Sequence, residues 1–465
     1  MDTIDKLLLE NPPFAKALQA FSHKGKCNIY GMSGSQKSFL WALGQGHLTD
    51  VGENGSGDSV DTAIAKALRS DGTAFPPTII VVHSKEERER WERDIAFLAP
   101  HMKVRRFPLI DRVSFTTAAR SLEDQAEQMG ALSDLLWQRS VVVVATAEAA
   151  AQYVAEPVDL EEHIIHAQVG VDINRDKLLE ALVTNGYERV DQVEQRGHFA
   201  VCGDIVYVCS GDEDKPIRIE LFGDEVDTIR QFDEVTQRSI ENLEDATIAP
   251  FRMNVSDDLA TLFSYGKEAL LIVDEPLRVQ ESLKKYLKED PEHLKTHADW
   301  SVLTRTMVSP TQIAFTFMQQ RSTGLAGFTM LGIQGKSMTS FERQVPLFVD
   351  EVAQWHKLGH QVVLVMNNLQ RRQALEQALE AAHIPYQMAS EWGSQPGTVL
   401  FYQGLLTDGF ELPHSHFIVV TEGNIFGTQK RKLRKKREKG QEINYFTDLT
   451  VGDYVVHSTH GIGKY

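Results

Sequence analysis

The sequence predicts a multidomain α/β protein whose first domain is built around a parallel sheet. Three observations support this: a length of 465 residues, short apolar runs that alternate with helical patterns, and a phosphate-loop-like segment between one such run and a helix. A chain of this length is expected to form roughly two to four domains. Continuous apolar strands separated by helices are typical of a parallel sheet covered on both faces.

Residues 1–156 are predicted to form the first α/β domain. Apolar runs predict strands at 27–30, 78–82, 104–107 and 141–145, and helical patterns predict helices at 85–98 and 118–137.

From Pro157 the pattern changes to that of a small α+β insert. The insert is predicted to span 157–212, and the first sheet is expected to resume within 213–335. The sequence predicts a helix at 175–185, a β-rich run at 199–208 and an alternating, half-exposed strand at 217–222.

A second, separate α/β domain is predicted over 341–428. Its expected elements are strands at 361–366, 398–402 and 416–420 and a helix at 368–381. A basic linker is expected at 429–445, and 446–465 reads as the start of a β-domain. Because about 20 residues cannot bury enough surface to fold alone, this last domain is predicted to be truncated.

A degenerate phosphate-binding loop lies at 31–38, which reads GMSGSQKS. In the pattern G-x-x-x-x-G-K-[ST], backbone N–H groups surround the phosphates and the lysine reaches the outer ones. Gly31, Gly34, Lys37 and Ser38 are present, but Gln36 stands where the pattern has glycine. A side chain at this position crowds the approach of phosphate to the backbone. The loop therefore predicts a binding module and not a motor.

A second nucleotide-site motif is the apolar run 270–273 that ends in Asp274 and Glu275. In a working site the Asp holds Mg²⁺ and the Glu orients water. The alternative is a core strand whose exit carries acidic residues, which is a common arrangement. A weak nucleotide-binding or NTPase unit that uses Lys37, Ser38, Asp274 and Glu275 therefore remains an alternative function.

Charge is unevenly distributed along the chain. The net charge is −17, yet residues 430–439 hold eight basic residues and one acidic residue. An acidic surface repels nucleic acid, so proteins are the expected partners of most of the chain. The basic run is predicted to be a solvated linker, and a DNA-binding module at 430–439 is the alternative.

Other features narrow the functional class. No signal peptide, membrane-length apolar run, zinc spacing or nucleophile motif is found, and the three cysteines form no disulfide framework. We therefore expect a cytoplasmic protein, and we assign no catalytic residue, metal site or cofactor.

Four further segments carry a specific resemblance. Residues 187–204 (YERVDQVEQRGHFAVCGD), with 217–227 and 232–233, resemble the module that UvrB shares with the bacterial transcription-repair coupling factors (Mfd). The degenerate loop favours Mfd, because UvrB keeps an intact loop. The segment 451–465 is similar to the start of the CarD-like RNA-polymerase-interacting domain of Mfd. The resemblance covers essentially the whole chain.

The resemblance implies a non-motor, N-terminal region of an Mfd-type protein that recruits UvrA in nucleotide-excision repair. The complete family member is an ATP-dependent DNA translocase that displaces stalled RNA polymerase. Its motor, with its ATP and Mg²⁺, would lie beyond Tyr465. The implied partners of the chain are UvrA, RNA polymerase through the truncated domain, and DNA mainly through the motor, with no membrane. The chain itself is not expected to be an enzyme.

The resemblance also implies a UvrA-docking surface in the UvrB-like insert. UvrB uses three arginines there; Arg189 matches one of them, while Ala200 and Cys202 occupy the other two positions. We expect this departure to weaken docking, with Arg196 and Phe199 as residues that compensate.

Overall fold

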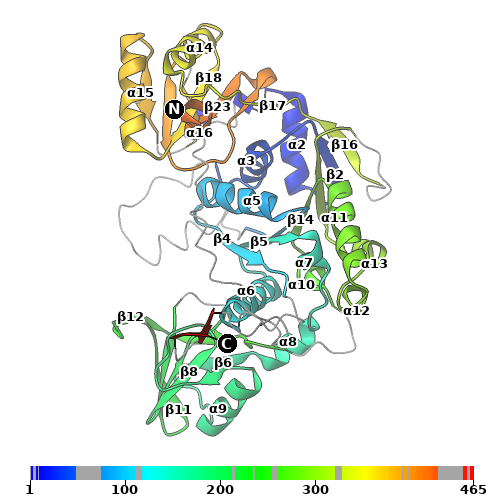
Figure 1. Cartoon of the computed structure of the whole chain (residues 1–465), viewed down its shortest axis with the longest axis vertical. Helices are drawn as coiled ribbons and strands as arrows, with labels where there is room; N and C mark the ends of the chain where they lie inside the picture. Colours follow the sequence, from blue (N-terminus) through cyan, green and yellow to red (C-terminus); the bar gives the residue numbers. More distant parts are fainter. Residues whose placement is uncertain are drawn as a thin grey trace. The chain divides into compact units, whose positions relative to one another are not determined.

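The computed structural model describes residues 2–3, 7–8, 10–48, 75–110, 118–211, 215–233, 236–253, 260–319, 327–389, 392–395, 397–427, 454–457 and 461–464. The chain divides into one unit at 1–426 and a second at 427–465 (Figure 1). The linker predicted at 429–445, with its basic run, lies outside the described residues.

The first unit contains a seven-stranded sheet in which all strands are parallel, as the apolar runs predict. The sheet draws on two separate stretches of the chain, because strands from 270–332 lie beside strands from 25–146. In sheet order, the strands are β16 (Thr329–Gly332), β2 (Gly25–Tyr30), β15 (Thr311–Thr316), β14 (Leu270–Asp274), β3 (Thr78–Val82), β5 (Val141–Thr146) and β4 (Lys103–Phe107).

Helices cover both faces of this sheet (Figure 1). Alternate strand residues point to opposite faces, so Ile80 packs with one helix layer while Ile79 packs with the other. One layer consists of α2 (Pro12–Ser22), α3 (Ser35–Gly44) and α5 (Lys85–Leu98). The other contains α6 (Ala118–Leu136), α7 (Ala147–Ala151), α10 (Leu262–Tyr265), α11 (Pro276–Glu289) and α13 (Trp300–Thr306). The short α12 (His293–Thr296) lies between α11 and α13 in sequence.

The insert forms a second sheet of six strands. Neighbouring strands are antiparallel, except that 188–189 and 198–202 pair in parallel. The boundary predicted at 212–213 lies between two paired strands of this sheet, β9 (Ile205–Val208) and β10 (Ile217–Phe222). In sheet order, the strands are β12 (Ser239–Leu243), β11 (Glu225–Phe232), β10 (Ile217–Phe222), β9 (Ile205–Val208), β8 (His198–Cys202) and β7 (Glu188–Arg189). Accompanying elements are α8 (Pro157–His163), α9 (Arg175–Thr184) and the pair β6 (Ile165–Gln168) and β13 (Asp245–Ile248).

Residues 336–426 form a third, mixed sheet of six strands. In sheet order, they are β17 (Lys336–Ser337), β22 (Phe410–Leu412), β23 (Phe417–Thr421), β18 (Gln361–Met366), β21 (Val399–Gln403) and β19 (Tyr386–Met388). Its helices are α14 (Val345–Lys357), α15 (Leu369–Ala381) and α16 (Glu422–Phe426), and a 3₁₀ turn spans Pro413–Ser415. A separate two-stranded pair joins β1 (Asp2–Thr3) to β20 (Gly393–Ser394).

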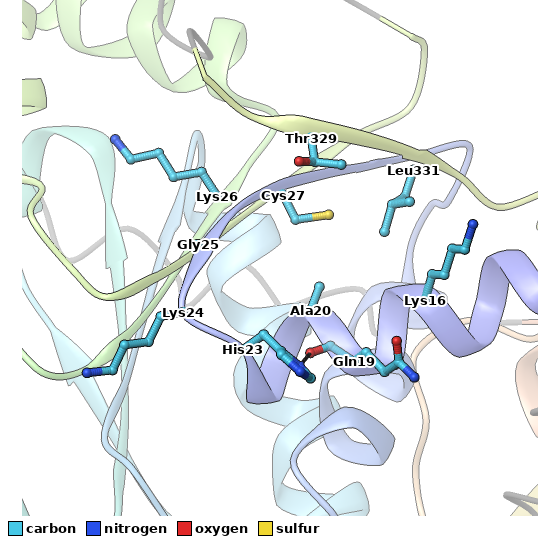
Figure 2. Close-up of a pocket in the computed structure, with 10 residues that line it drawn as sticks. All are labelled: Lys16, Gln19, Ala20, His23, Lys24, Gly25, Lys26, Cys27, Thr329 and Leu331. Carbon is cyan, nitrogen blue, oxygen red and sulfur yellow. Dashed lines mark hydrogen bonds between the residues drawn. The ribbon is translucent and has the colours of Figure 1, made fainter.

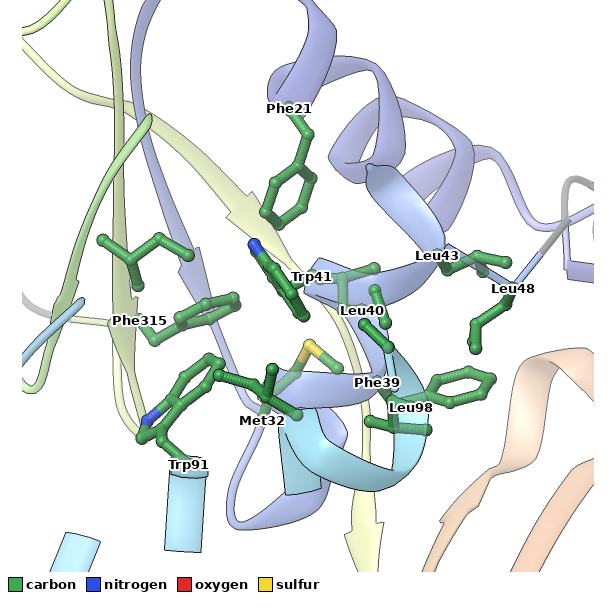
Figure 3. Close-up of a cluster of buried hydrophobic side chains, with 14 of the residues drawn as sticks. Phe21, Met32, Phe39, Leu40, Trp41, Leu43, Leu48, Trp91, Leu98 and Phe315 are labelled. Atoms are coloured by element: carbon green, nitrogen blue, oxygen red, sulfur yellow. The ribbon is translucent and has the colours of Figure 1, made fainter. Parts of the chain in front are cut away.

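The two faces of this third sheet are covered differently. Val362, Leu364 and Phe401 pack with α14 and α15, whereas Val363 and Val365 belong to the same apolar cluster as α3 and α5. Figure 3 shows the part of this cluster that the first domain supplies, with Phe39 of α3 among side chains that include Phe21, Leu98 and Phe315. The first and third sheets therefore share one continuous core.

The second unit contains an antiparallel hairpin of β24 (Tyr454–His457) and β25 (Gly461–Lys464). Among the described residues, no helix has the length and apolar character needed to span a bilayer. Multidomain α/β architecture with a parallel sheet is thus confirmed.

Candidate functional site

The degenerate phosphate loop joins β2 to α3, as the sequence predicts. Two of its glycines adopt backbone angles that favour glycine: φ is +91° at Gly31 and +53° at Gly34. A Cβ at Gly31 would lie 2.3 Å from the carbonyl oxygen of Ile333. The loop therefore keeps the tight glycine-dependent turn of a phosphate site, and the segment that follows β16 packs directly against it.

Gln36, which replaces the missing glycine, is completely buried in the loop. Its Oε1 accepts a hydrogen bond from the Ser33 N–H at 3.3 Å. A Cβ added at Gly335 would lie 1.9 Å from the same oxygen, so the glutamine fills the space in front of that glycine. Among the described residues, the Gln36 Nε2 has no hydrogen-bond partner.

Lys37 reaches the carboxylates at the end of β14 and is held there. Its Nζ lies 2.5 Å from Oδ1 of Asp274 and 3.8 Å from Oε1 of Glu275. Burial by itself would lower the pKa of Lys37, but the two carboxylates outweigh burial and raise that pKa above its usual value. The other Asp274 oxygen accepts the indole N–H of Trp91 at 2.9 Å. The lysine and aspartate of a nucleotide site are thus paired with each other.

The Ser38 hydroxyl, which would bind Mg²⁺ in a working loop, has internal partners. It lies 2.8 Å from Oδ2 of Asp94 and 3.0 Å from the carbonyl oxygen of Ser35. Burial raises the pKa of Asp94, although hydrogen bonds from Ser35, Ser38 and Thr407 oppose that rise. Glu275 also has a partner, because its Oε1 accepts the Phe317 N–H at 2.7 Å.

The structure therefore brings together the residues predicted for the degenerate nucleotide site: Gly31, Gly34, Lys37, Ser38, Asp274 and Glu275. Sequence reasoning missed two residues of α5: Trp91, which donates to Asp274, and Asp94, which accepts from Ser38. One sequence feature could have pointed to Trp91 and Asp94: they lie three residues apart, on the apolar face of a predicted helix whose other residues are mostly charged.

The predicted UvrA-docking residues differ in accessibility. Arg189 is exposed on β7, and among the described residues no side chain pairs with its guanidinium. Arg196 is ion-paired with Glu127 of α6 at 2.8 Å. Phe199, the third candidate for a UvrA contact, is only 1% exposed and packs in the core of the insert, so its side chain is not on the surface of the folded chain. Successive side chains of a strand point to opposite faces, and Phe199 lies on the inner face of β8, which packs in the core of the insert.

The two positions at which UvrB-like arginines are missing also differ. Ala200 is 5% exposed and packs with Val193 and Cys209, whereas Cys202 is exposed at the end of β8. An arginine at 202 would have space, but an arginine at 200 would not.

A charged cluster missed by sequence reasoning lies on two neighbouring strands of the insert. Glu220 Oε1 lies 3.1 Å from Nε of Arg218 and 3.6 Å from Nη1 of Arg230. Arg218 pairs in register with both Tyr207 and Arg230. The alternation of 217–222 was the available signal, because it places Arg218 and Glu220 on one face.

A separate pocket of about 330 Å³ lies between α2, the start of β2 and β16 (Figure 2). Ala20, Cys27 and Leu331 supply apolar lining, and Lys16, Lys24 and Lys26 are exposed residues at its border. Burial raises the pKa of the Cys27 thiol to about 11, so this thiol is uncharged at neutral pH. The pocket contains none of the predicted site residues. Among the described residues, no cluster of His, Cys, Asp and Glu has the arrangement of a metal site.

Comparison with known proteins gives a consistent result. The family model "UvrB interaction domain" matches residues 165–253, which include all six strands of the insert sheet. Transcription-repair-coupling factors of Bacillus subtilis and Staphylococcus haemolyticus are 27% and 24% identical, over 92% and 83% of this chain. That of Staphylococcus aureus is 23% identical over 83% of this chain.

The chain spans about two fifths of the length of these relatives, 43% for the first and 39% for the other two. A solved structure of Saccharomyces cerevisiae Dbp5 bound to Gle1 and IP6 covers 86% of this chain at 8% identity with a TM-score of 0.23, a similarity too low to bear on function. The chain is homologous to the N-terminal part of transcription-repair-coupling factor (Mfd) over about nine tenths of its length and contains a UvrB interaction domain.

Proposed function

We propose that this chain recruits UvrA in transcription-coupled nucleotide-excision repair, through the sheet of its UvrB interaction domain. The observation that carries the proposal is the match of 165–253 to that domain, together with an exposed Arg189 in it whose guanidinium has no side-chain partner in the part of the chain that the structure describes. An arginine without an internal partner can form a charge-assisted hydrogen bond to a partner carboxylate without first breaking an ion pair.

The proposed docking surface consists of the exposed Arg189 and Cys202 at the ends of β7 and β8. Phe199 is not part of it, because its side chain is buried. Arg196 contributes only if its ion pair with Glu127 breaks, so Arg189 is the main contact. Removing a charge that is fully desolvated in an interface costs about 2–5 kcal/mol, whereas removing a rim charge costs far less.

The wider role follows from the relatives and is part of the same proposal. The chain would act in the cytoplasm as a non-motor scaffold. In the full protein, an ATP-dependent DNA translocase would displace stalled RNA polymerase. Contact with polymerase is assigned to the domain that starts at 446–465 and contact with DNA mainly to the motor, and a DNA contact through 430–439 stays an untested alternative.

We also infer that the degenerate loop binds no nucleotide. Three features support this: Gln36 fills the loop, Lys37 is neutralised by Asp274, and Ser38 is engaged by Asp94. A nucleotide would have to break a buried ion pair before it could reach the lysine. Calorimetric titration with millimolar Mg-ATP tests the inference. No heat of binding is expected, whereas saturable binding that Lys37→Ala abolishes would establish the NTPase-like alternative.

The proposal is tested by calorimetric titration of the chain with purified UvrA. The unmodified chain is expected to bind, and Arg189→Ala to weaken binding by roughly tenfold or more. Arg305→Ala is the matched control, because Arg305 is an exposed arginine on α13, outside the UvrB interaction domain. Equal affinity of the Arg189→Ala variant and the control for UvrA would show that Arg189 does not contribute to the interface. Absence of binding by the unmodified chain would show that UvrA is not its partner.

A further inference from the structure

The face of the third sheet opposite α14 and α15 is apolar and needs a cover. Val363, Val365, Leu400, Phe417 and Val419 lie on it and are almost completely buried. At about 25 cal/mol per Å², the exposure of several such side chains would be costly, so this face requires a packing partner.

That partner is the helix layer of the first sheet, and in particular the helix of the degenerate loop. Phe39 of α3 contacts the rings of Trp392, Phe410 and Phe417 at centroid distances of 5.3–5.6 Å. On α5, Phe97 packs so closely against Gly404 that a Cβ there would lie 2.0 Å from its ring.

The loop at 404–409, which follows β21, also engages the beginning of α3. The Thr407 N–H donates to Asp94 Oδ1 at 2.8 Å, and Asp94 Oδ2 accepts from Ser38. The Asp408 N–H donates to Ser35 Oγ at 2.9 Å. These bonds connect the loop to two residues of the phosphate-loop motif.

The Asp408 carboxylate lies at the N-terminus of α3. A Cβ on Gly34, the N-cap residue, would be 2.7 Å from Asp408 Oδ2. A helix N-terminus carries a partial positive charge and favours an anion, and it is where phosphate binds in an intact loop. Arg90 of α5 holds the same carboxylate at 3.3 Å.

We propose that the phosphate-loop motif of this chain is an intramolecular docking site, in which the loop 404–409 replaces nucleotide phosphate and anchors residues 336–426 to the first sheet. The retained Gly34 provides room for Asp408, and Ser35 accepts the Asp408 N–H. Ser38 acts through Asp94, whose carboxylate accepts both the Ser38 hydroxyl and the Thr407 N–H. Docking of this loop and binding of phosphate exclude each other. The motif thus has a structural role that is independent of UvrA recruitment.

Hydrogen exchange of the full chain tests the docking site. Ser35→Ala removes the acceptor of the Asp408 N–H and is expected to speed amide exchange in 404–409 by about tenfold, without affecting the strands of the first sheet. Gly34→Ala, which introduces the clash with Asp408, should have a larger effect. Gly203→Ala is the matched control, because Gly203 also has a positive φ, +63°, but open space around it.

Unchanged exchange of 404–409 in Ser35→Ala would overturn the proposal, even if Gly34→Ala failed to fold. A second measurement addresses phosphate exclusion. Gln36→Gly restores the consensus loop but leaves Asp408 in place, so millimolar Mg-ATP is expected to show no binding to it. Saturable binding of Mg-ATP to this variant would show that the glutamine, and not loop 404–409, keeps phosphate out.

Discussion

At the residue scale, the buried pair of Lys37 and Asp274 determines what the degenerate loop can do. Both side chains are almost fully buried, 8% and 2% exposed, and their charges compensate each other within the protein. Such a pair does not need a ligand, and it is disrupted only at a cost. The lysine, which sequence analysis identified as a phosphate contact, has a structural role here.

Lys37→Ala is therefore expected to destabilise the fold. The substitution leaves the Asp274 carboxylate buried without its cation, which costs about 3–5 kcal/mol in free energy of unfolding. Urea denaturation measures the loss. The double variant Lys37→Met, Asp274→Asn removes both charges and retains an acceptor for the Trp91 N–H, so it should be clearly more stable than Lys37→Ala. Equal stabilities of the two variants would contradict this explanation.

Asp94 is a second residue whose burial has a measurable consequence. Its pKa is raised in the folded protein, so the folded state holds its proton to a higher pH than the unfolded state does. The contribution of protonated Asp94 to the free energy of unfolding is fully present below the pKa of an unfolded aspartate, about 3.9. This contribution is lost as pH rises through the higher pKa that Asp94 has in the folded protein.

Asp94→Asn should remove the loss of stability at higher pH, because asparagine does not ionise. Its amide oxygen can still accept the Thr407 N–H. The free energy of unfolding of Asp94→Asn, relative to the unmodified chain, is expected to increase as pH rises from about 4 to 8. Asp94→Ala, which lacks any acceptor, should be less stable than both at neutral pH. A stability difference between Asp94→Asn and the unmodified chain that is constant with pH would refute the assignment.

At the element scale, strand β8 determines which positions are available for docking. Phe199 and Ala200 are adjacent in sequence and point to opposite faces, yet both are buried. Phe199 packs in the core of the insert, whereas Val193 covers Ala200. Cys202 lies where the strand ends and is exposed. The strand thus leaves one of the two substituted arginine positions accessible.

Cys202→Arg is expected to strengthen UvrA binding, because it restores a cation at an exposed position of the proposed surface. The gain should be severalfold, since a rim charge contributes about 0.2–1 kcal/mol. Ala200→Arg should instead lower the free energy of unfolding by roughly 3 kcal/mol or more, because it buries an unpaired charge. Calorimetry with UvrA and urea denaturation measure the two effects; weaker binding by a folded Cys202→Arg variant would argue against this surface.

At the scale of the whole molecule, the continuous core is the dominant feature of residues 1–426. The cluster that contains Phe39 includes side chains of both the first and the third sheet. A sheet with helices on only one face cannot exclude water from the other, so residues 336–426 depend on the first domain. We expect the two sheets to unfold together.

Phe39→Ala is expected to reduce stability by about 3–5 kcal/mol and to separate the unfolding of the two sheets. Urea denaturation followed by Trp fluorescence and circular dichroism should then give transitions that do not coincide. Phe348→Ala removes an equally buried ring from the core between the third sheet and its own helices. It should lower the urea concentration at the midpoint of unfolding, but the chain should still unfold in a single transition. A single transition for Phe39→Ala would contradict coupling through this ring.

Many of the elements, and the residues of the degenerate site, could be predicted from local sequence patterns. The helix expected at 85–98 and the strands expected at 78–82, 217–222 and 361–366 are present with the same bounds. Local periodicity predicts such elements because it reflects which side of each one is buried. The motif residues were found because a strand, a tight loop and a helix are consecutive in the chain.

Local patterns do not predict what covers each surface, and the folded structure was needed to show it. Alternation places Phe199 and Cys202 on opposite faces of β8, but it does not show which face is inside or that Val193 covers Ala200. Similarly, nothing local connects Gly34 with Asp408, which is more than 370 residues away and fills its anion position. Such contacts depend on how separate sheets pack, and packing is set by the complementarity of whole surfaces and not by the order of residues within one element.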